Sequence, residues 1–483
     1  MKIGVIIFDD PTAGEQGWGA KSGHDAERIN GINGLDQEYI WITNVDYKDF
    51  NNLGFRNVSY LREAHYMRAT VKSFIEELGL KSSPSEAAEV LANIFQRVIN
   101  FGNEMFGINP QEPTHRYANL LAQKIIPMDM RKPPTFNNES ISDALEEATQ
   151  IMQNNVGRRP NGRKAVTVSM PRIAYFNWLL SLSIPVDREW KKIAFTGGEF
   201  EVGVEKGSVV EGTKTRLSKL DKLSTENAFL FNISLKSMED EYLSFASFGV
   251  GKKTHRTWVT YPELKELARY SRIQVKKGLK TKIGKLDEDV LDKDPSTNFS
   301  YSKGIFLENL FSALSTNVDG MLNGVIPYIR AYDRMACLKA AEVLNNEGYY
   351  VMSYSLGKIV VLVPETGMND FVSKTLSMGL MPPVSLLSSI GSGETYVENE
   401  IINEWMPEGL FEEIQKDWFI EFVRTLTPAG LINKELIIEI DDILEKPKAT
   451  REEELDSVIK KMIDRSDEIS DKMDDEDTEM IEI

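Results

Sequence analysis

The chain has 483 residues, of which 41% are hydrophobic and 27% are charged. These values are ordinary for globular proteins, and they exclude wholesale disorder, a collagen-like sequence and a chain made only of coiled coil. The 56 Lys and Arg residues against 74 Asp and Glu give a net charge of −18, and the length predicts about two to four domains.

Few side chains are suited to hold a metal through sulfur or imidazole. The one cysteine, Cys337, excludes an internal disulfide framework and a zinc site built from several thiolates. The four histidines are too scattered in the sequence to suggest a metal cage. No run of about 18 apolar residues is present, and the first residues lead directly into a strand. We therefore expect no membrane span and no signal peptide, and a cytoplasmic location.

The N-terminal part is predicted to alternate strands and helices. An apolar, β-branched run at Lys2–Phe8 predicts a buried strand, and Tyr39–Thr43 predicts a second. Ser83, Pro84 and Glu86 have the pattern of a capping box with proline at the first helical position. The expected helices cover residues 61–78, 83–103, 115–126 and 140–154, and a proline-containing linker covers 131–139.

The central part differs in character because its apolar runs are short and separated by Gly, Ser and charged clusters. That spacing predicts an antiparallel sheet or small barrel over roughly 190–260. The runs cover residues 194–196, 200–204, 228–235 and 242–248. An acidic, proline-broken stretch at 286–298 is the second expected linker.

The C-terminal part is predicted to be helical around one hairpin. Two apolar runs at 349–363 flank Ser355-Leu356-Gly357, which predicts a β-hairpin. The expected helices cover 306–322, 325–345, 409–426 and 451–463. The resulting fold class is mixed α/β (α+β), with four predicted domains. These are an N-terminal α/β domain at 1–130, a central basic β-rich domain at 140–285, a helical domain with the hairpin at 303–445, and an acidic helix and tail at 446–483.

Positive charge is concentrated between residues 252 and 285, where eleven Lys and Arg face two Glu, a net of +9 in an acidic protein. Aromatic residues are interleaved with these bases, and phosphate neutralisation together with base stacking is what single-stranded nucleic acid requires. A second basic stretch at 158–164 is expected to add to the same face. The predicted nucleic-acid-binding residues are Arg158, Arg159, Arg163, Lys164, Lys252, Lys253, Arg256, Trp258, Tyr261, Arg269, Tyr270, Arg272, Lys276, Lys277, Lys280 and Lys282. The same pattern also fits a solvated face whose aromatics belong to the core, and that alternative stays open.

The last eighteen residues, 466–483, contain nine acids and a single lysine. Such like-charge density predicts a segment that does not fold by itself. We expect this acidic tail to compete with nucleic acid for the basic surface and to recruit protein partners through its apolar end, Met480, Ile481 and Ile483. In charge and position the tail is similar to the acidic tails of bacterial and phage single-stranded-DNA-binding proteins, although no residue motif is shared. A purely solubilising tail is the alternative.

Signals for catalysis are weaker. The glycine-rich stretch from Gly14 to Ser22 could cradle a phosphate with Lys21 as counter-charge, and a helix is expected at 24–30 after it. In the P-loop pattern, however, a lysine follows the second glycine directly, and Ala20 intervenes here. A plain turn is therefore the favoured interpretation.

Two short segments resemble parts of DNA polymerases. The run that ends in Asp9 and Asp10 resembles the first exonuclease motif, but Pro11 stands where that motif has its glutamate. A two-metal site there would lack a ligand, which leaves both aspartates as weak metal candidates. Residues 329–334, a helix and the 349–363 hairpin resemble the palm of family B polymerases, whose hairpin carries catalytic aspartates that are absent from Tyr354-Ser355-Leu356-Gly357. Neither resemblance identifies a family.

Together these observations predict a non-catalytic, cofactor-free protein that binds nucleic acid, preferentially single-stranded, as an accessory in replication, recombination or transcription. No membrane partner is expected. Two alternatives stay open. One is a nucleotide- or nucleotide-sugar-dependent enzyme that uses Asp9, Asp10 and the glycine-rich stretch with Mg²⁺. The other is a structural or assembly protein of the virion type.

Overall fold

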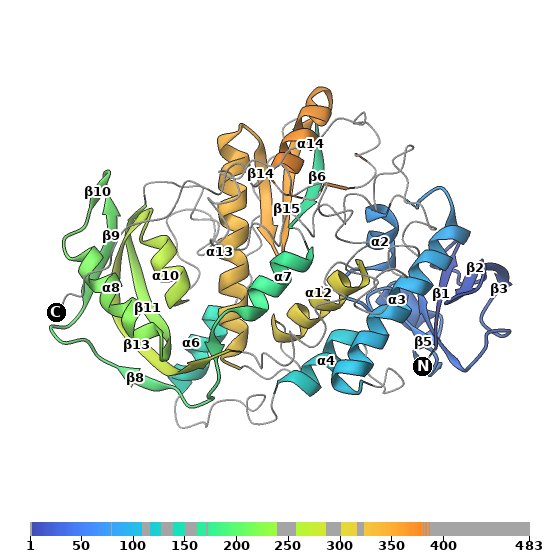
Figure 1. Cartoon of the computed structure of the whole chain (residues 1–483), viewed down its shortest axis with the longest axis horizontal. Coiled ribbons are helices and arrows are strands. Elements are labelled where there is room, and N and C mark those ends of the chain that lie inside the picture. Colours follow the sequence, from blue (N-terminus) through green and yellow to red (C-terminus); the bar gives the residue numbers. More distant parts are fainter. Residues whose placement is uncertain are drawn as a thin grey trace, which may run out of the picture.

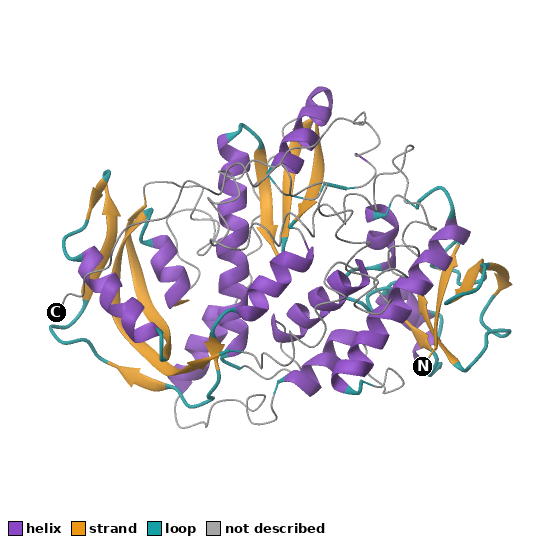
Figure 2. Cartoon of the chain, in the orientation of Figure 1, coloured by secondary structure: helices purple, strands orange, loops and turns teal. Residues whose placement is uncertain are grey.

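A computed structural model of the chain confirms the mixed α/β class (Figures 1 and 2). It describes residues 2–78, 80–108, 116–126, 139–149, 162–170, 172–238, 257–285, 301–315, 323–378, 380, 382–383 and 386. Three sheets are present among them. The N-terminal sheet and the central sheet lie at opposite ends of the view in Figure 1, and the third sheet lies between them beside a long helix.

The N-terminal sheet is mixed, with strand order β3-β2-β1-β4-β5. Strands β1 and β4 are parallel, as are β4 and β5, whereas β1–β2 and β2–β3 are antiparallel. Successive residues of β1 alternate between two hydrophobic clusters, as the two faces of a buried strand require. The strands are β1 Lys2–Phe8, β2 Gln16–Lys21, β3 Glu27–Asn30, β4 Tyr39–Thr43 and β5 Leu61–Arg62.

The predicted strands β1 and β4 are confirmed, but the glycine-rich stretch is neither a loop nor the start of a helix. It forms β2, and β3 replaces the helix expected at 24–30. The glycines serve strand packing, since a Cβ at Gly17 would collide with the Ile7 carbonyl oxygen and one at Gly4 would collide with the Trp41 ring. Glycine here permits close approach of neighbouring groups within one sheet.

Helices cover this sheet and extend the core from it. The helix predicted at 83–103 is confirmed as α3, although Ser83 makes no side-chain capping bond. The helix predicted at 61–78 is wrong in its first part, which forms β5, and only α2 is helical. The elements are α1 Tyr47–Asn52, the 3-10 helix η1 Phe55–Asn57, α2 Val71–Glu77, α3 Pro84–Phe106, α4 Tyr117–Ile125 and α6 Glu139–Thr149.

The central sheet is antiparallel and follows the path β10-β9-β13-β11-β12, with β7 and β8 also paired to β13. Its existence confirms the predicted β-rich region. The strand predicted at 194–196 is found slightly earlier in the chain, as β8. The apolar run at 242–248 lies outside the described residues. The strands are β7 Ile184–Pro185, β8 Lys191–Ile193, β9 Phe200–Glu205, β10 Ser208–Val209, β11 Asn227–Met238, β12 Trp258–Thr260 and β13 Ser271–Gly284.

Helices α8 Thr213–Ser224 and α10 Tyr261–Leu267 contribute apolar side chains to a core on one face of this sheet. Leu220 of α8 and Leu264 of α10 belong to the same buried cluster as Phe229 and Phe231 of β11. On the opposite face, Leu230 and Leu279 belong to the large core that continues through the rest of the molecule. The central sheet therefore has buried side chains on both of its faces.

The third sheet, with order β14-β15-β6, contains the predicted hairpin, which is confirmed. Strand β6 comes from much earlier in the chain and pairs antiparallel with β15 along its whole length. The strands are β6 Arg163–Ser169, β14 Tyr350–Ser355 and β15 Lys358–Pro364. The remaining elements are α7 Arg172–Ser181, α12 Tyr301–Ser315, α13 Val325–Asn346, the 3-10 helix η3 Glu365–Gly367 and α14 Met368–Ser377.

Helix α13 connects the central and third sheets (Figure 1). Toward the central sheet, the Tyr328 hydroxyl accepts from the Phe229 amide at 2.5 Å and donates to its carbonyl at 2.9 Å. Arg330 donates to the carbonyls of Ser315 and Thr149, the last residues of α12 and α6. Because helix C-terminal carbonyls lack intrahelical partners, one half-buried guanidinium satisfies a terminal carbonyl of each of two helices.

Several predicted features lie outside the described residues. They are the linker 286–298, all of the linker 131–139 except its last residue, the helices 409–426 and 451–463, and the acidic tail 466–483. Within the part of the chain that the structure describes, no helix combines the length and apolarity needed to cross a membrane.

Candidate nucleic-acid interface

The structure places the predicted basic residues on more than one sheet. Arg163 and Lys164 begin β6 in the third sheet, and Lys164 pairs with Glu365 at 3.3 Å. The bases from Lys265 onward belong to α10, β13 and the turn between them in the central region. The two groups are thus separated in the fold (Figure 1). The predicted residues Arg158, Arg159, Lys252, Lys253 and Arg256 lie outside the described residues.

Two of the three aromatic residues expected to stack on bases are buried. Trp258 is 7% exposed and Tyr261 is 5% exposed, each within a hydrophobic core. The Tyr261 hydroxyl donates to Asp221 at 2.8 Å. The Glu147 carboxylate accepts from the Trp258 amide at 3.2 Å, which fastens β12 to α6. These side chains stabilise the fold and offer no exposed ring to a ligand.

Tyr270, the third aromatic, is half-buried and also engaged. Its hydroxyl donates to the Glu342 carboxylate at 3.1 Å, and the Arg269 guanidinium lies 5.2 Å from its ring centroid. Burial raises the pKa of both Tyr270 and Tyr261, and the carboxylates beside them raise it further. Both hydroxyls therefore stay protonated, as hydrogen-bond donors, throughout the neutral range.

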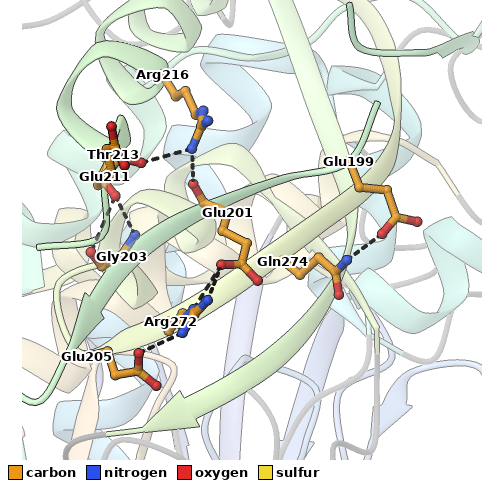
Figure 3. Close-up of polar contacts among 9 residues, drawn as sticks. All are labelled: Glu199, Glu201, Gly203, Glu205, Glu211, Thr213, Arg216, Arg272 and Gln274. Carbon is orange, nitrogen blue, oxygen red and sulfur yellow. Dashed lines mark hydrogen bonds and ion pairs between the residues drawn. The ribbon is translucent and has the colours of Figure 1, made fainter. Parts of the chain in front are cut away.

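Arg272 of β13 is neutralised by its neighbouring strand (Figure 3). Its Nε and Nη2 donate to one Glu201 oxygen at 2.9 and 2.6 Å, and its Nη1 donates to Glu205 at 2.6 Å. These bonds hold the pKa of Arg272 above its ordinary value. The arrangement follows from the strand register. Gly203 of β9 lies directly opposite Arg272, and Glu201 and Glu205 lie two residues to either side of Gly203.

The other arginines of the central sheet region also donate to carboxylate or carbonyl oxygens of the protein. Arg216 Nη1 donates to the carbonyls of Glu201 and Glu211 at 2.7 and 3.1 Å (Figure 3). Arg269 pairs with Glu266 at 2.7 Å, and Arg188 pairs with Glu189 at 3.5 Å. Within residues 182–238 and 257–285, every arginine therefore has a carboxylate or carbonyl partner. Among the lysines, Lys265 pairs with Asp221 at 2.9 Å.

A different set of cations forms no ion pair with any residue that the structure describes. Lys280 and Lys282 lie two residues apart on β13, so their side chains share one face of the sheet. Lys191 of β8 is directly opposite Lys280 in the antiparallel register and therefore lies on that face too. Within the described residues none of the three forms an ion pair. We call Lys191, Lys280 and Lys282 the lysine strip.

Two more exposed lysines precede the strip on β13. Lys276 and Lys277 lie at a register shift between β13 and β11, where Lys276 has no opposite residue. The Lys277 ammonium lies 5.7 Å from the centroid of the Trp258 ring, a cation–π contact at the sheet edge. The bulge brings two consecutive lysines to the surface and extends the positive charge along the strand.

The central sheet region as a whole is positive within an acidic chain. Residues 182–238 and 257–285 contain seventeen Lys and Arg against ten Asp and Glu. Six of those ten acids already form ion pairs, mostly with arginines. The excess positive charge of the region therefore lies mainly on its exposed lysines. Local charge of this kind attracts anions even when the net charge is negative.

Sequence reasoning found Lys276, Lys277, Lys280 and Lys282 but missed Lys191. The paired Lys191-Lys192 before an apolar strand position was a visible signal. Only the strand pairing shows that Lys191 lies opposite Lys280.

The N-terminal candidates for metal or phosphate binding are engaged in local contacts. Arg28 donates to both Asp9 oxygens, which lowers the pKa of that carboxyl. Asp10 accepts from the amide and hydroxyl of Thr12 at 2.9 and 2.7 Å. Lys21 pairs with Asp36 at 3.0 Å. In the described part of the chain, no group of three or more His, Cys, Asp or Glu is arranged to hold a metal ion.

One buried carboxylate, which the sequence analysis named only as part of the 329–334 segment, lies against the hairpin turn. Asp333 of α13 accepts from the Leu356 amide at 2.5 Å, the Gly357 amide at 2.8 Å and the Tyr175 hydroxyl at 2.8 Å. Leu356 and Gly357 both have positive φ, of 56° and 66°. The Asp333 carboxylate thus holds a tight turn and occupies the space behind its tip. Its sequence signals were its place in the 329–334 segment and the apolar residues around it on the predicted helix.

The comparisons with known proteins give limited similarity. No family model and no curated protein matches the sequence. The structure is weakly similar to phi29 DNA polymerase. Compared with an orthorhombic crystal form of that enzyme, this chain has 10% sequence identity and a TM-score of 0.40. The match covers 74% of this chain and 80% of that chain. Its complex with single-stranded DNA gives 10% identity and a TM-score of 0.39 over 76% and 82% of the two chains. Similarity of this size transfers no activity to this chain.

Proposed function

We propose that this chain is a non-catalytic nucleic-acid-binding protein that contacts phosphates through the lysine strip together with Lys276 and Lys277. The observation that carries the proposal is the direct opposition of Lys191 and Lys280 across two strands, with Lys282 beside them and no carboxylate paired to any of the three among the described residues. The preference for single strands that the sequence suggested rested on three aromatic rings, of which two are buried and the third is half-buried with its hydroxyl bonded to Glu342, and it is not part of the proposal.

Like charges directly opposite each other on a sheet are unfavourable. Arg272 of this sheet and Arg216 of α8 donate to carboxylate or carbonyl oxygens, so the fold supplies partners to other cations of this region. The lysines of the strip form no ion pair among the described residues, which is consistent with a partner from outside the described structure. A polyanion relieves the repulsion and gains counterion release.

Replacing the strip with glutamine, as K191Q/K280Q/K282Q, is expected to weaken binding of an oligonucleotide at least tenfold at low salt. Three lost phosphate contacts should also reduce the slope of log K against log salt by about 2–3. Fluorescence anisotropy with a labelled oligonucleotide at several salt concentrations measures both quantities.

A matched control is available on α8, where Lys214, Lys219 and Lys222 are exposed and form no ion pair among the described residues. The variant K214Q/K219Q/K222Q changes the net charge by the same amount. It should bind much more tightly than the strip variant. Equal losses in the two variants would show that only net charge matters and would remove the strip as the site.

We also propose that the acidic tail, residues 466–483, competes with nucleic acid for these lysines and carries the contacts to protein partners. Nine acids in eighteen residues make the tail a polyanion within the same molecule. Deleting residues 466–483 should tighten oligonucleotide binding, with the largest gain at low salt where electrostatic competition is strongest. Unchanged affinity in the truncated chain at all salt concentrations would contradict the competition.

A further inference from the structure

The two kinds of cation in the central sheet region have different surroundings. All four arginines, Arg188, Arg216, Arg269 and Arg272, donate to carboxylates or carbonyls within the fold. The lysines of the strip, together with Lys276, are exposed or half-exposed and form no ion pair among the described residues. The planar guanidinium groups therefore bind acceptors within the protein, whereas the ammonium groups of the flexible lysine side chains remain for a ligand.

The three aromatic side chains that were predicted to stack on bases are also engaged within the fold. Trp258 and Tyr261 are buried, and Lys277 lies over the Trp258 ring. Tyr270 has its hydroxyl on Glu342 and the Arg269 guanidinium beside its ring. Base recognition by proteins uses stacking on exposed rings or planar, bidentate groups on base edges. In the described part of the central sheet region, the four arginines and the rings of Trp258, Tyr261 and Tyr270 are thus engaged within the fold.

We propose that the lysine strip binds the phosphate backbone alone and does not read bases. The inference rests on the proposed function and specifies its ligand class: a linear chain of phosphates, regardless of base sequence and of the presence of a base. Contacts to phosphate fix the position of a protein on nucleic acid but carry no sequence information. An ammonium group on a flexible stem gains nearly the same interaction from any phosphate that it reaches.

The test is a competition experiment with the full-length protein and a labelled oligonucleotide. The competitors are unlabelled oligonucleotides of equal length and different base composition, an abasic strand of that length, and inorganic polyphosphate, all matched in phosphate concentration. We expect the abasic strand and the base-containing strands to compete within about threefold of one another, because each presents the same number of charges. Polyphosphate should compete as well, which separates the phosphate chain from the sugar.

A mixed-sequence strand that competes more than about tenfold better than the abasic strand would overturn the inference, since stacking or edge contacts would then be needed to explain it. The variant K191Q/K280Q/K282Q gives a second measure. It should weaken the abasic and base-containing strands by the same factor, and a loss confined to the base-containing strands would contradict backbone binding. Failure of the labelled strand to bind at all would instead overturn the proposed function itself, so the two failures are distinguishable.

Discussion

Replacing Arg334 with methionine is expected to lower the free energy of unfolding by about 3–5 kcal/mol. Arg334 Nη2 lies 2.5 Å from Glu263 Oε1, and the two side chains are 5% and 0% exposed. The other Glu263 oxygen accepts from the amide and hydroxyl of Thr260 at 3.0 and 3.1 Å, which completes a capping box at α10. Methionine fills similar space but leaves a buried carboxylate without its cation.

The measurement is urea-induced unfolding of the wild type and two variants. R334M should lose the most stability, whereas R334M/E263Q should recover a large part of it, because glutamine removes the orphaned charge and still accepts from Thr260. This order separates the cost of an unpaired charge from the cost of altered packing. A double variant less stable than R334M would contradict the assigned role of the ion pair, since the carboxylate would then stabilise the fold without its cation.

The second large effect is expected at Asp333. Changing it to asparagine should cost about 1–3 kcal/mol, because an NH2 group then faces one of the backbone amides of Leu356 and Gly357 or the Tyr175 hydroxyl. Two donors that face each other in a buried site leave at least one of them unsatisfied. Tyr175→Phe removes only one of the three bonds and should cost less than D333N in the same urea experiment.

Glu347→Gln serves as the matched control, since it removes one carboxylate from the exposed end of the same helix. Glu347 pairs with Lys374 at 3.2 Å and its side chain is 41% exposed, so the expected change is at most about 1 kcal/mol. If D333N unfolds at the same urea concentration as E347Q, the carboxylate does not hold the turn.

The effect of Asp333 should also depend on pH. Burial raises the pKa of this carboxyl above its ordinary value, although the donated hydrogen bonds oppose the shift. The native state then binds the proton more tightly than the unfolded state. The stability contributed by the titration of Asp333 is fully present below its ordinary pKa and is lost as pH rises through the raised value. The difference in stability between the wild type and D333N should therefore widen as pH falls through this window.

Much of the secondary structure was visible in the sequence because it depends on local pattern. The apolar run of β1, the proline-initiated helix α3 and the 349–363 hairpin were each predicted at nearly their observed bounds. Strand β13 was missed because the bulge at Lys276 and Lys277 interrupts the alternation of apolar and polar residues that marks a strand. Glycine-rich β2 was missed because glycines that permit close approach between strands have the same composition as a loop.

What the sequence alone determined was the mixed α/β class, the position of most helices and the location of the excess positive charge in the central part of the chain. Only the tertiary structure decided which cations are neutralised and which aromatics are exposed. Strand register places Glu201 and Glu205 beside Arg272 but Lys191 opposite Lys280, and packing of α6 and α10 buries Trp258 and Tyr261. Charge neutralisation and burial depend on contacts between residues far apart in the chain. Local periodicity does not encode those contacts.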